Sequence, residues 1–171
     1  MTSQGTSHEF FMRAALEEAE QALAAGEFPV GCVISDGKKI LAAGGRTGSG
    51  QARPDETSHA EIMALKNLGT RPEPPDPSRL VLYSTLEPCL MCFGATLIHG
   101  INAIVYACED VMGGGTGCDL SILPPLYRNR PMSIIAGVLR QESLDLLRSF
   151  YADPAHAYLR RTELARFIMS R

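Results

Sequence analysis

Hydrophobic and polar residues along the chain repeat with two periods, and each period predicts a different kind of element. Near the N-terminus, apolar residues recur at helical spacing as far as Leu23, and Ser7 and Gly26 are residue types that favour the two ends of such a helix. Short apolar runs rich in β-branched residues then alternate with further amphipathic stretches. This pattern predicts helices over residues 7–23, 57–69, 88–99, 141–150 and 155–169, and strands over 30–35, 39–43, 80–84, 101–107 and 133–138.

The order of these elements predicts a protein of the α/β class. Asp36-Gly37 is a turn signal that favours an antiparallel hairpin between the first two strands. The strand–helix–strand unit over 80–107 favours a parallel crossover instead. Residues 44–57 form a long polar loop, and prolines make 71–77 an irregular connector. We expect a three-layer α/β/α sandwich around a central five-stranded mixed sheet.

Length and composition change this picture little. A chain of 171 residues is typical of one domain, and its 45% hydrophobic and 20% charged residues are ordinary for a globular protein. We expect a single domain over 1–171, with a flexible arm at 1–6 and a C-terminal helix over 154–171. No apolar stretch is long enough to span a bilayer, and the first residues do not resemble a secretory signal, so we expect a cytoplasmic protein without a membrane partner. Five cysteines in such a chain argue against disulfides.

The charge pattern gives no general attraction to nucleic acid, because the formal net charge is −3. Residues 156–171 nevertheless carry four arginines against one acid, which indicates either a solvated helix face or a surface for an anionic partner. The glycine-rich run 113–117 lacks the lysine of a phosphate-binding loop. We expect it to form a mobile rim of the active site.

Two short pieces carry candidate chemistry, each at a predicted helix start: His59-Ala60-Glu61 and Pro88-Cys89-Leu90-Met91-Cys92. One imidazole and two thiolates supply the nitrogen and sulfur donors that zinc prefers, and three protein ligands leave a fourth position for water or hydroxide. Cys89 and Cys92 are three positions apart, so both sulfurs can face one side of a helix start, where the backbone amides favour the thiolate. The spacing predicts a catalytic zinc site.

Glu61 lies two positions after His59 and is therefore expected beside the metal rather than on it. A carboxylate there can take a proton from the bound water and hand it to a leaving amine. A Cys-x-x-Cys pair alone would also suit a structural zinc site or a dithiol. Joined to Pro88 and to the upstream His-x-Glu, it matches the signature of zinc deaminases. The alternative of another class is a non-catalytic zinc scaffold.

Three stretches carry a family resemblance: residues 24–33 (AAGEFPVGCV), 59–65 (HAEIMAL) and 84–95 (STLEPCLMCFGA). With them the chain resembles the cytidine and deoxycytidylate deaminase superfamily, and within it the branch of bacterial tRNA adenosine deaminases and guanine deaminases. The resemblance implies one zinc ion per chain held by His59, Cys89 and Cys92, with Glu61 as the proton shuttle. It also implies a homodimer or larger homo-oligomer, and it places Val30, Arg46, Ala60 and Glu87 at the substrate.

Two departures from the branch bear on the substrate. An asparagine usually helps to hold the base where this chain has Arg46, which offers donors only. Arg46 is therefore expected either to pair with an anionic or carbonyl-rich substrate group or to be an exposed loop residue. Residues 109–116 are acidic to neutral where the tRNA enzymes tend to be basic, which weakens phosphate binding. The sequence thus favours deamination of a small nucleobase or nucleoside, with tRNA adenosine as the disfavoured alternative.

Overall fold

The computed structural model of the chain describes residues 3–171, and its centre is one five-stranded sheet with the strand order β2-β1-β3-β4-β5. The strands are β1 (Gly31–Ser35), β2 (Ile40–Gly45), β3 (Val81–Leu86), β4 (Ala103–Cys108) and β5 (Ser133–Ala136). β1 is antiparallel to both β2 and β3, whereas β3, β4 and β5 run parallel. The predicted mixed sheet and its hairpin are therefore confirmed.

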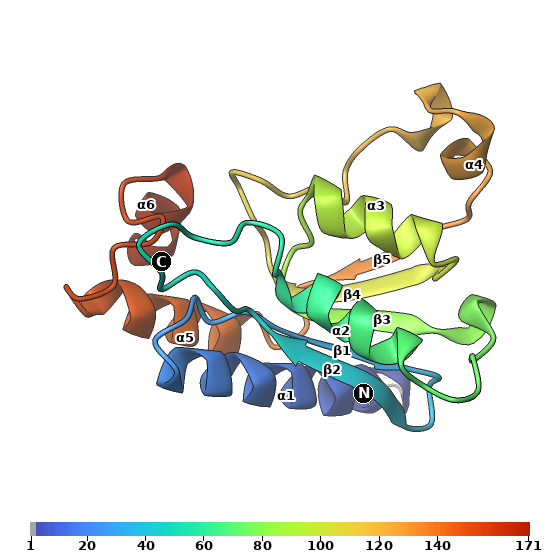
Figure 1. Ribbon diagram of the computed structural model, residues 1–171, viewed down its shortest axis with the longest axis horizontal. Helices are drawn as coiled ribbons and strands as arrows, with labels where there is room; N and C mark the ends of the chain where they lie inside the picture. The colour runs from blue at the N-terminus through green and yellow to red at the C-terminus, as the bar shows by residue number, and fades with distance from the viewer. Residues whose placement is uncertain (1–2) are drawn as a thin grey trace.

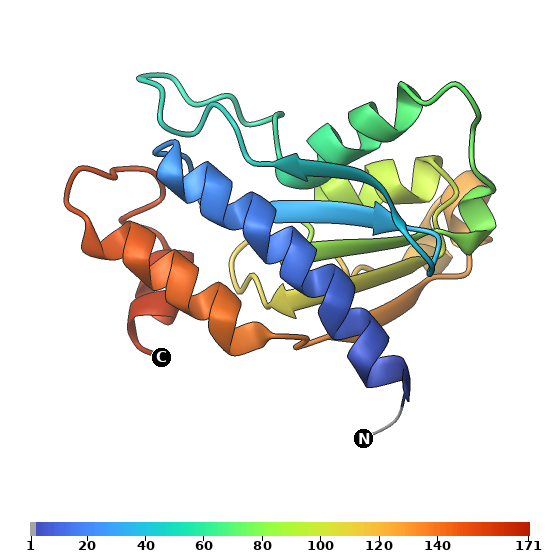
Figure 2. The same cartoon turned by 90° about the horizontal axis from the view of Figure 1, so that it is seen from below.

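Helices cover both faces of the sheet (Figures 1 and 2). They are α1 (Ser3–Ala24), α2 (Ala60–Gly69), α3 (Leu90–Ile98), α4 (Pro125–Arg128), α5 (Arg140–Ala152) and α6 (Glu163–Met169), with 3-10 turns at Pro77–Arg79 and Leu120–Ile122. α1 and α5 lie on one face and α2 and α3 on the other (Figure 1). This arrangement confirms the three-layer α/β/α sandwich.

Successive side chains of a strand point in opposite directions, and the three central strands β1, β3 and β4 are buried on both faces. Val33, Tyr83 and Val105 pack in one apolar cluster with α1. Their neighbours in sequence, among them Ile34 and Leu82, pack in a second cluster with α2 and α3. The sequences of these strands are therefore continuous apolar runs and do not alternate between apolar and polar residues.

Both ends of the chain differ from expectation. α1 begins at Ser3, so residues 3–6 are helical and the predicted arm is wrong there, since no proline interrupts the helix; residues 1–2 lie outside the described part. The predicted C-terminal helix over 154–171 is present only as α6 (Glu163–Met169) and is wrong over 154–162. Turns occupy 154–162, Leu159 has a left-handed φ of 53°, and Thr162 caps the shorter α6.

Within residues 3–171, no helix combines the length and the apolar character that a membrane span requires. The cysteines are free thiols, as expected. The carboxyl ends of β3 and β4 and the loop that follows β2 lie at the same end of the sheet as the first turns of α2 and α3 (Figure 1). The sequence motifs meet at that end.

Candidate metal centre and active site

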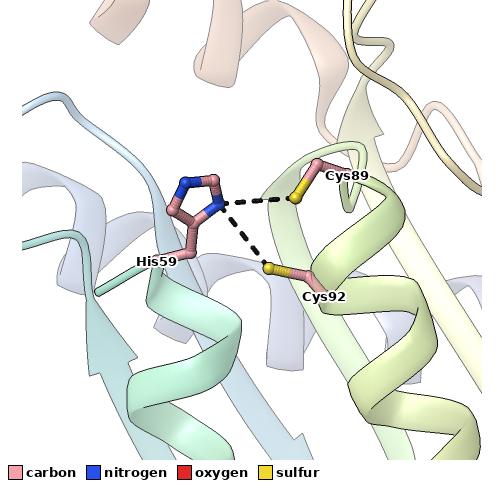
Figure 3. A group of neighbouring side chains, drawn as sticks. All are labelled: His59, Cys89 and Cys92. Atoms are coloured by element: carbon pink, nitrogen blue, oxygen red, sulfur yellow. Dashed lines mark hydrogen bonds between the residues drawn. The ribbon is translucent and has the colours of Figure 1, made fainter. Parts of the chain in front are cut away.

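Three side chains with zinc-binding donors converge at the starts of α2 and α3 (Figure 3). His59 is the N-cap of α2 and Cys89 is the N-cap of α3, both with extended backbone, and neither side chain caps its helix. Cys92 lies one turn into α3. The predicted start of α2 at residue 57 is too early, because the hydroxyls of Thr57 and Ser58 donate to Asp55 and the helix begins at Ala60. The donors of His59 and Cys89 are therefore free for a metal.

The spacing of the three donors fits zinc. Nδ1 of His59 lies 3.6 Å from the sulfur of Cys89 and 3.6 Å from the sulfur of Cys92, and all three donor atoms lie within 4.8 Å of one another. A tetrahedral zinc ion with its usual bond lengths places its ligand atoms roughly 3.6–3.8 Å apart. The predicted ligand set is thus brought together at the right separation by two helix starts that lie 30 positions apart in sequence.

The two sulfurs differ in protonation. The hydrogen bond from Cys92, together with that from His59, lowers the pKa of Cys89 to about 4. The thiolate of Cys89 and burial raise the pKa of Cys92 well above its ordinary value. Cys92 must therefore lose its proton before both sulfurs can bind a cation as thiolates.

Glu61 lies in the first turn of α2, only 3% exposed, beside the three donors. Its Oε1 accepts a hydrogen bond from the Ser84 hydroxyl at 3.3 Å, and its Oε2 accepts one from the Cys92 thiol at 3.4 Å. Burial raises the pKa of Glu61 above that of an ordinary glutamate. The structure thus places a buried carboxyl group with a raised pKa beside the three donors.

A cavity of about 200 Å³ opens above these residues, and the four predicted substrate contacts all line it. These are Val30, Arg46, Ala60 and Glu87. Sequence reasoning missed several other lining residues, among them Glu56, Asp110, Met112, Tyr158, Leu159 and Leu164. The cavity is smaller than the pockets that hold drug-sized ligands. Its size suits a single base.

Glu87 forms hydrogen bonds that hold the glycine-rich run beside the metal centre. Its carboxylate accepts hydrogen bonds from the hydroxyl and the backbone N–H of Thr116 and from the backbone N–H of Asp110. Gly114 forms an isolated bridge with Cys89. The predicted rim of the active site therefore lies against the start of α3. Its predicted mobility stays a prediction.

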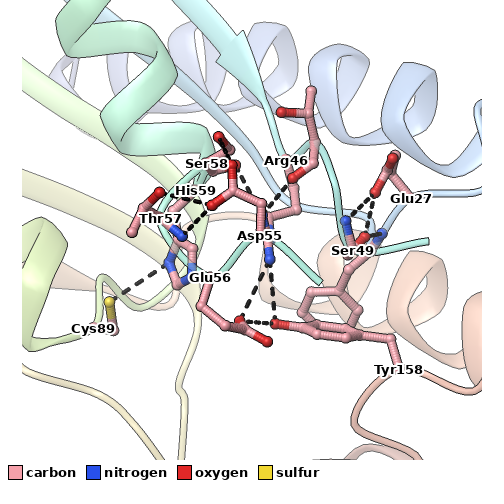
Figure 4. Close-up of polar contacts among 12 residues, drawn as sticks. Glu27, Arg46, Ser49, Asp55, Glu56, Thr57, Ser58, His59, Cys89 and Tyr158 are labelled. Atoms are coloured by element: carbon pink, nitrogen blue, oxygen red, sulfur yellow. Dashed lines mark hydrogen bonds and ion pairs between the residues drawn. The ribbon is translucent and has the colours of Figure 1, made fainter. Parts of the chain in front are cut away.

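Arg46 is not the exposed loop residue that the sequence left open, because it is only 3% exposed. It follows β2, and its guanidinium contacts Glu56 of the polar loop and Tyr158 of the C-terminal segment (Figure 4). A contact between Arg46 and the substrate stays a prediction.

Comparison with known proteins gives one consistent result. Residues 5–108 match the profile of the cytidine and deoxycytidylate deaminase zinc-binding region. The tRNA-specific adenosine deaminase of Haemophilus influenzae is 36% identical over 144 residues, which is 84% of this chain and 82% of the relative. That of Bacillus subtilis is 32% identical over 86% of this chain and 91% of the relative.

Solved structures agree. One comes from a study of A-to-I editing by tRNA deaminases at the wobble position; it has a TM-score of 0.59 and 30% identity, over 81% of this chain and 99% of the other. A mutant protein crystallised in complex with 8-azaguanine has a TM-score of 0.64 and 26% identity, over 85% of this chain and 84% of the other. The profile match covers most of the chain, including all three metal ligands and Glu61. The chain belongs to the cytidine and deoxycytidylate deaminase family.

Proposed function

We propose that this zinc-dependent hydrolytic deaminase acts on an adenosine in tRNA and converts it to inosine. One observation carries the reaction: Glu61 lines the same cavity as His59 and Cys89, and its carboxylate also contacts the sulfur of Cys92, the third donor of the cluster. Similarity to relatives named tRNA-specific adenosine deaminases, which extends over more than four-fifths of the chain, supports the substrate. It reverses the preference for a small molecule that the acidic residues 109–116 suggested. A cytoplasmic location and a homodimer stay predictions.

The protein's own groups divide the work as follows. His59, Cys89 and Cys92 would hold the zinc ion, which when bound supplies an activated water at neutral pH. Glu61 takes a proton from that water and delivers it to the amine that leaves as ammonia. The Ser84 hydroxyl holds Oε1 of Glu61, so that the carboxyl group keeps its orientation during both transfers. One water is consumed, and an exocyclic amine is replaced by a carbonyl.

The cavity favours an extruded base over a stacked one. With a volume of about 200 Å³ it has room for a base but not for a base pair. Enzymes that act on a base in nucleic acid must take it out of the stack, and single-stranded loops make this inexpensive. Arg160, Arg161 and Arg166 are exposed charges that phosphates of such a loop can meet.

A second candidate is the deamination of a free purine. The pocket wall carries Arg46 with Glu56 and Tyr158 where the branch of tRNA adenosine deaminases and guanine deaminases usually has asparagine. Tyr158, Leu159 and Leu164 of the C-terminal segment also line the pocket. The similarity to a protein crystallised with 8-azaguanine is consistent with this candidate.

The deciding experiment offers the purified protein five substrates: a tRNA anticodon stem-loop, adenosine, adenine, guanosine and guanine. Ammonia release and inosine formation are measured, with Glu61→Gln and Cys89→Ala as controls. We expect inosine in the stem-loop, no turnover with Glu61→Gln and no bound zinc with Cys89→Ala. Turnover of guanine alone would replace the tRNA proposal by the second candidate. Zinc bound without turnover of any substrate would favour the non-catalytic scaffold.

A further inference from the structure

Within residues 3–171, the second ring nitrogen of the metal ligand His59 has no hydrogen bond to another protein group. A histidine that binds a metal generally donates its second ring N–H to a carboxylate, a carbonyl or a water, and this bond fixes the plane of the ring. Nδ1 of His59 faces the two sulfurs (Figure 3). Among the described side chains, no hydrogen bond reaches its Nε2. The position of the imidazole therefore depends on the backbone that carries it.

That backbone is anchored at the residue just before His59. The carbonyl oxygen of Ser58 accepts hydrogen bonds from Nη1 of Arg46, at 3.0 Å, and from the backbone N–H of Thr47, at 3.2 Å. Nη1 of Arg46 also donates to the carbonyl oxygen of Thr47. Arg46 thus connects the first and the last residues of the polar loop, next to the start of α2. Its own backbone N–H donates to Val30 at 2.8 Å, which fixes it to the sheet.

Arg46 is held in turn from its other side (Figure 4). Nη2 lies 3.5 Å from Oε2 of Glu56 and 3.4 Å from the hydroxyl oxygen of Tyr158. The Tyr158 hydroxyl donates to the same Glu56 oxygen at 2.6 Å, and the Tyr158 ring lies 5.6 Å from the guanidinium carbon. The partners of Arg46 therefore come from the polar loop and, 112 positions away, from the C-terminal segment.

We propose that Arg46 is a positioning residue for the metal centre: it holds the Ser58 carbonyl and thereby His59, and Glu56 and Tyr158 hold Arg46. Only the guanidinium has the planar fork that reaches both sets of acceptors. The positive charge is buried beside Glu56, which offsets its cost. Nη1 and Nη2 already have protein partners, so their donors hold the loop rather than the base.

The test is zinc affinity, measured by competition with a chelator of known affinity on the folded metal-free protein. Loss of a partner that orients a metal ligand typically weakens metal binding by about 10–100-fold. We expect Arg46→Gln to raise the zinc dissociation constant by that factor. Arg46→Lys should resemble it, because an ammonium group has no fork. Arg53→Gln removes an exposed arginine from the same loop and is the matched control, with wild-type affinity expected.

Two milder variants test the outer contacts and keep the proposal falsifiable if Arg46→Gln does not fold. Tyr158→Phe and Glu56→Gln should each raise the dissociation constant less than Arg46→Gln. Tyr158→Phe should add nothing further in the Arg46→Gln background, because it acts through Arg46. Circular dichroism and thermal unfolding of each metal-free variant separate lost positioning from lost folding.

Several results would overturn the proposal. Wild-type zinc affinity in the folded Arg46→Gln protein is one, and an equal loss in Arg53→Gln is another. Wild-type zinc affinity in both Tyr158→Phe and Glu56→Gln would show that these two residues do not help Arg46 to position the metal centre. An unchanged zinc affinity with a raised KM for the substrate would make Arg46 a substrate contact instead. Zinc affinity is measured without any substrate, so failure of this proposal is distinguishable from failure of the proposed function.

Discussion

Gly115 packs against the backbone of Cys89 and Leu90 at the start of α3, and its replacement by alanine gives a sharp prediction. A Cβ atom at this position would lie 2.6 Å from the backbone nitrogen of Leu90, 2.7 Å from its Cα atom and 2.8 Å from the carbonyl carbon of Cys89. These contacts are with backbone atoms at the start of α3. No rotation of a side chain can relieve them, so either the run or the start of α3 must move.

Two routes give a similar cost for Gly115→Ala. Forcing an extra methyl group into a packed site costs about 1–3 kcal/mol. If the run moves away instead, it loses the bond from the Gly115 N–H to the Pro88 carbonyl and the bonds from Thr116 to Glu87, at about 1 kcal/mol each. We therefore expect a loss of about 1–3 kcal/mol. For a chain of this size, the melting temperature falls by about 2–4 °C per kcal/mol.

The assay is thermal unfolding of the metal-free and the zinc-loaded protein, together with zinc affinity. Gly117→Ala is the matched control in the same run, because nothing lies within 4 Å of its added Cβ and its φ is not left-handed. We expect the control to keep both the stability and the zinc affinity of the wild type. Gly115→Ala should lower both, since Cys89 shares the contact. A melting temperature of Gly115→Ala equal to that of Gly117→Ala would refute the packing described for this run.

Other substitutions test the remaining parts of the site. Glu61→Gln should lower kcat by about 100–10,000-fold. It should also raise the melting temperature of the metal-free protein, because a neutral amide replaces a carboxyl group whose pKa is raised by burial. A lower melting temperature would contradict this explanation. Ser84→Ala should lower kcat by about tenfold with zinc affinity unchanged, since a hydrogen bond to a charged group contributes about 1.5 kcal/mol or more; an unaltered kcat would exclude the role given to Ser84. Hydrogen bonds from Ser58 and Thr57 hold the pKa of Asp55 well below its usual range, so its stabilising effect is present above about pH 4 and is lost as the pH falls further. The melting temperature of Asp55→Asn should therefore fall less than that of the wild type as the pH is lowered from about 6 to about 3. An equal fall in both proteins would show that the carboxylate contributes nothing.

The family resemblance predicted the deaminase activity, whereas the preference for a small substrate came from a departure from the family pattern. The acidic residues 109–116 argued against tRNA, but in the structure this stretch serves the protein itself. Asp110 accepts hydrogen bonds from the backbone N–H groups of Met112 and Gly113, and Glu109 forms an ion pair with Arg140. Carboxylates that form hydrogen bonds and ion pairs within the protein say little about whether it binds nucleic acid. Relatives that share most of the chain's length are better evidence for the substrate than a count of local charges.

Sequence by itself determined the features that depend on neighbours along the chain. Apolar runs and turn signals predicted the five strands and the order of layers, because the periods of strands and helices are local properties. The three-residue spacing of Cys89 and Cys92 and the two-residue spacing of His59 and Glu61 predicted the ligands and the carboxyl group beside them. The ends of elements were less accessible. Thr57 and Ser58 are good caps by type, yet Asp55 takes their hydroxyls.

Tertiary structure alone decided what surrounds that centre. Nothing local to Arg46 indicates that Tyr158 lies 3.4 Å from its guanidinium, and nothing local to Glu87 indicates that it holds Thr116. The left-handed backbone at Leu159, which ends the predicted C-terminal helix and brings that segment to the pocket, is also a product of packing. Each of these contacts joins segments far apart in sequence. Their existence depends on the path of the whole chain, which no local preference specifies.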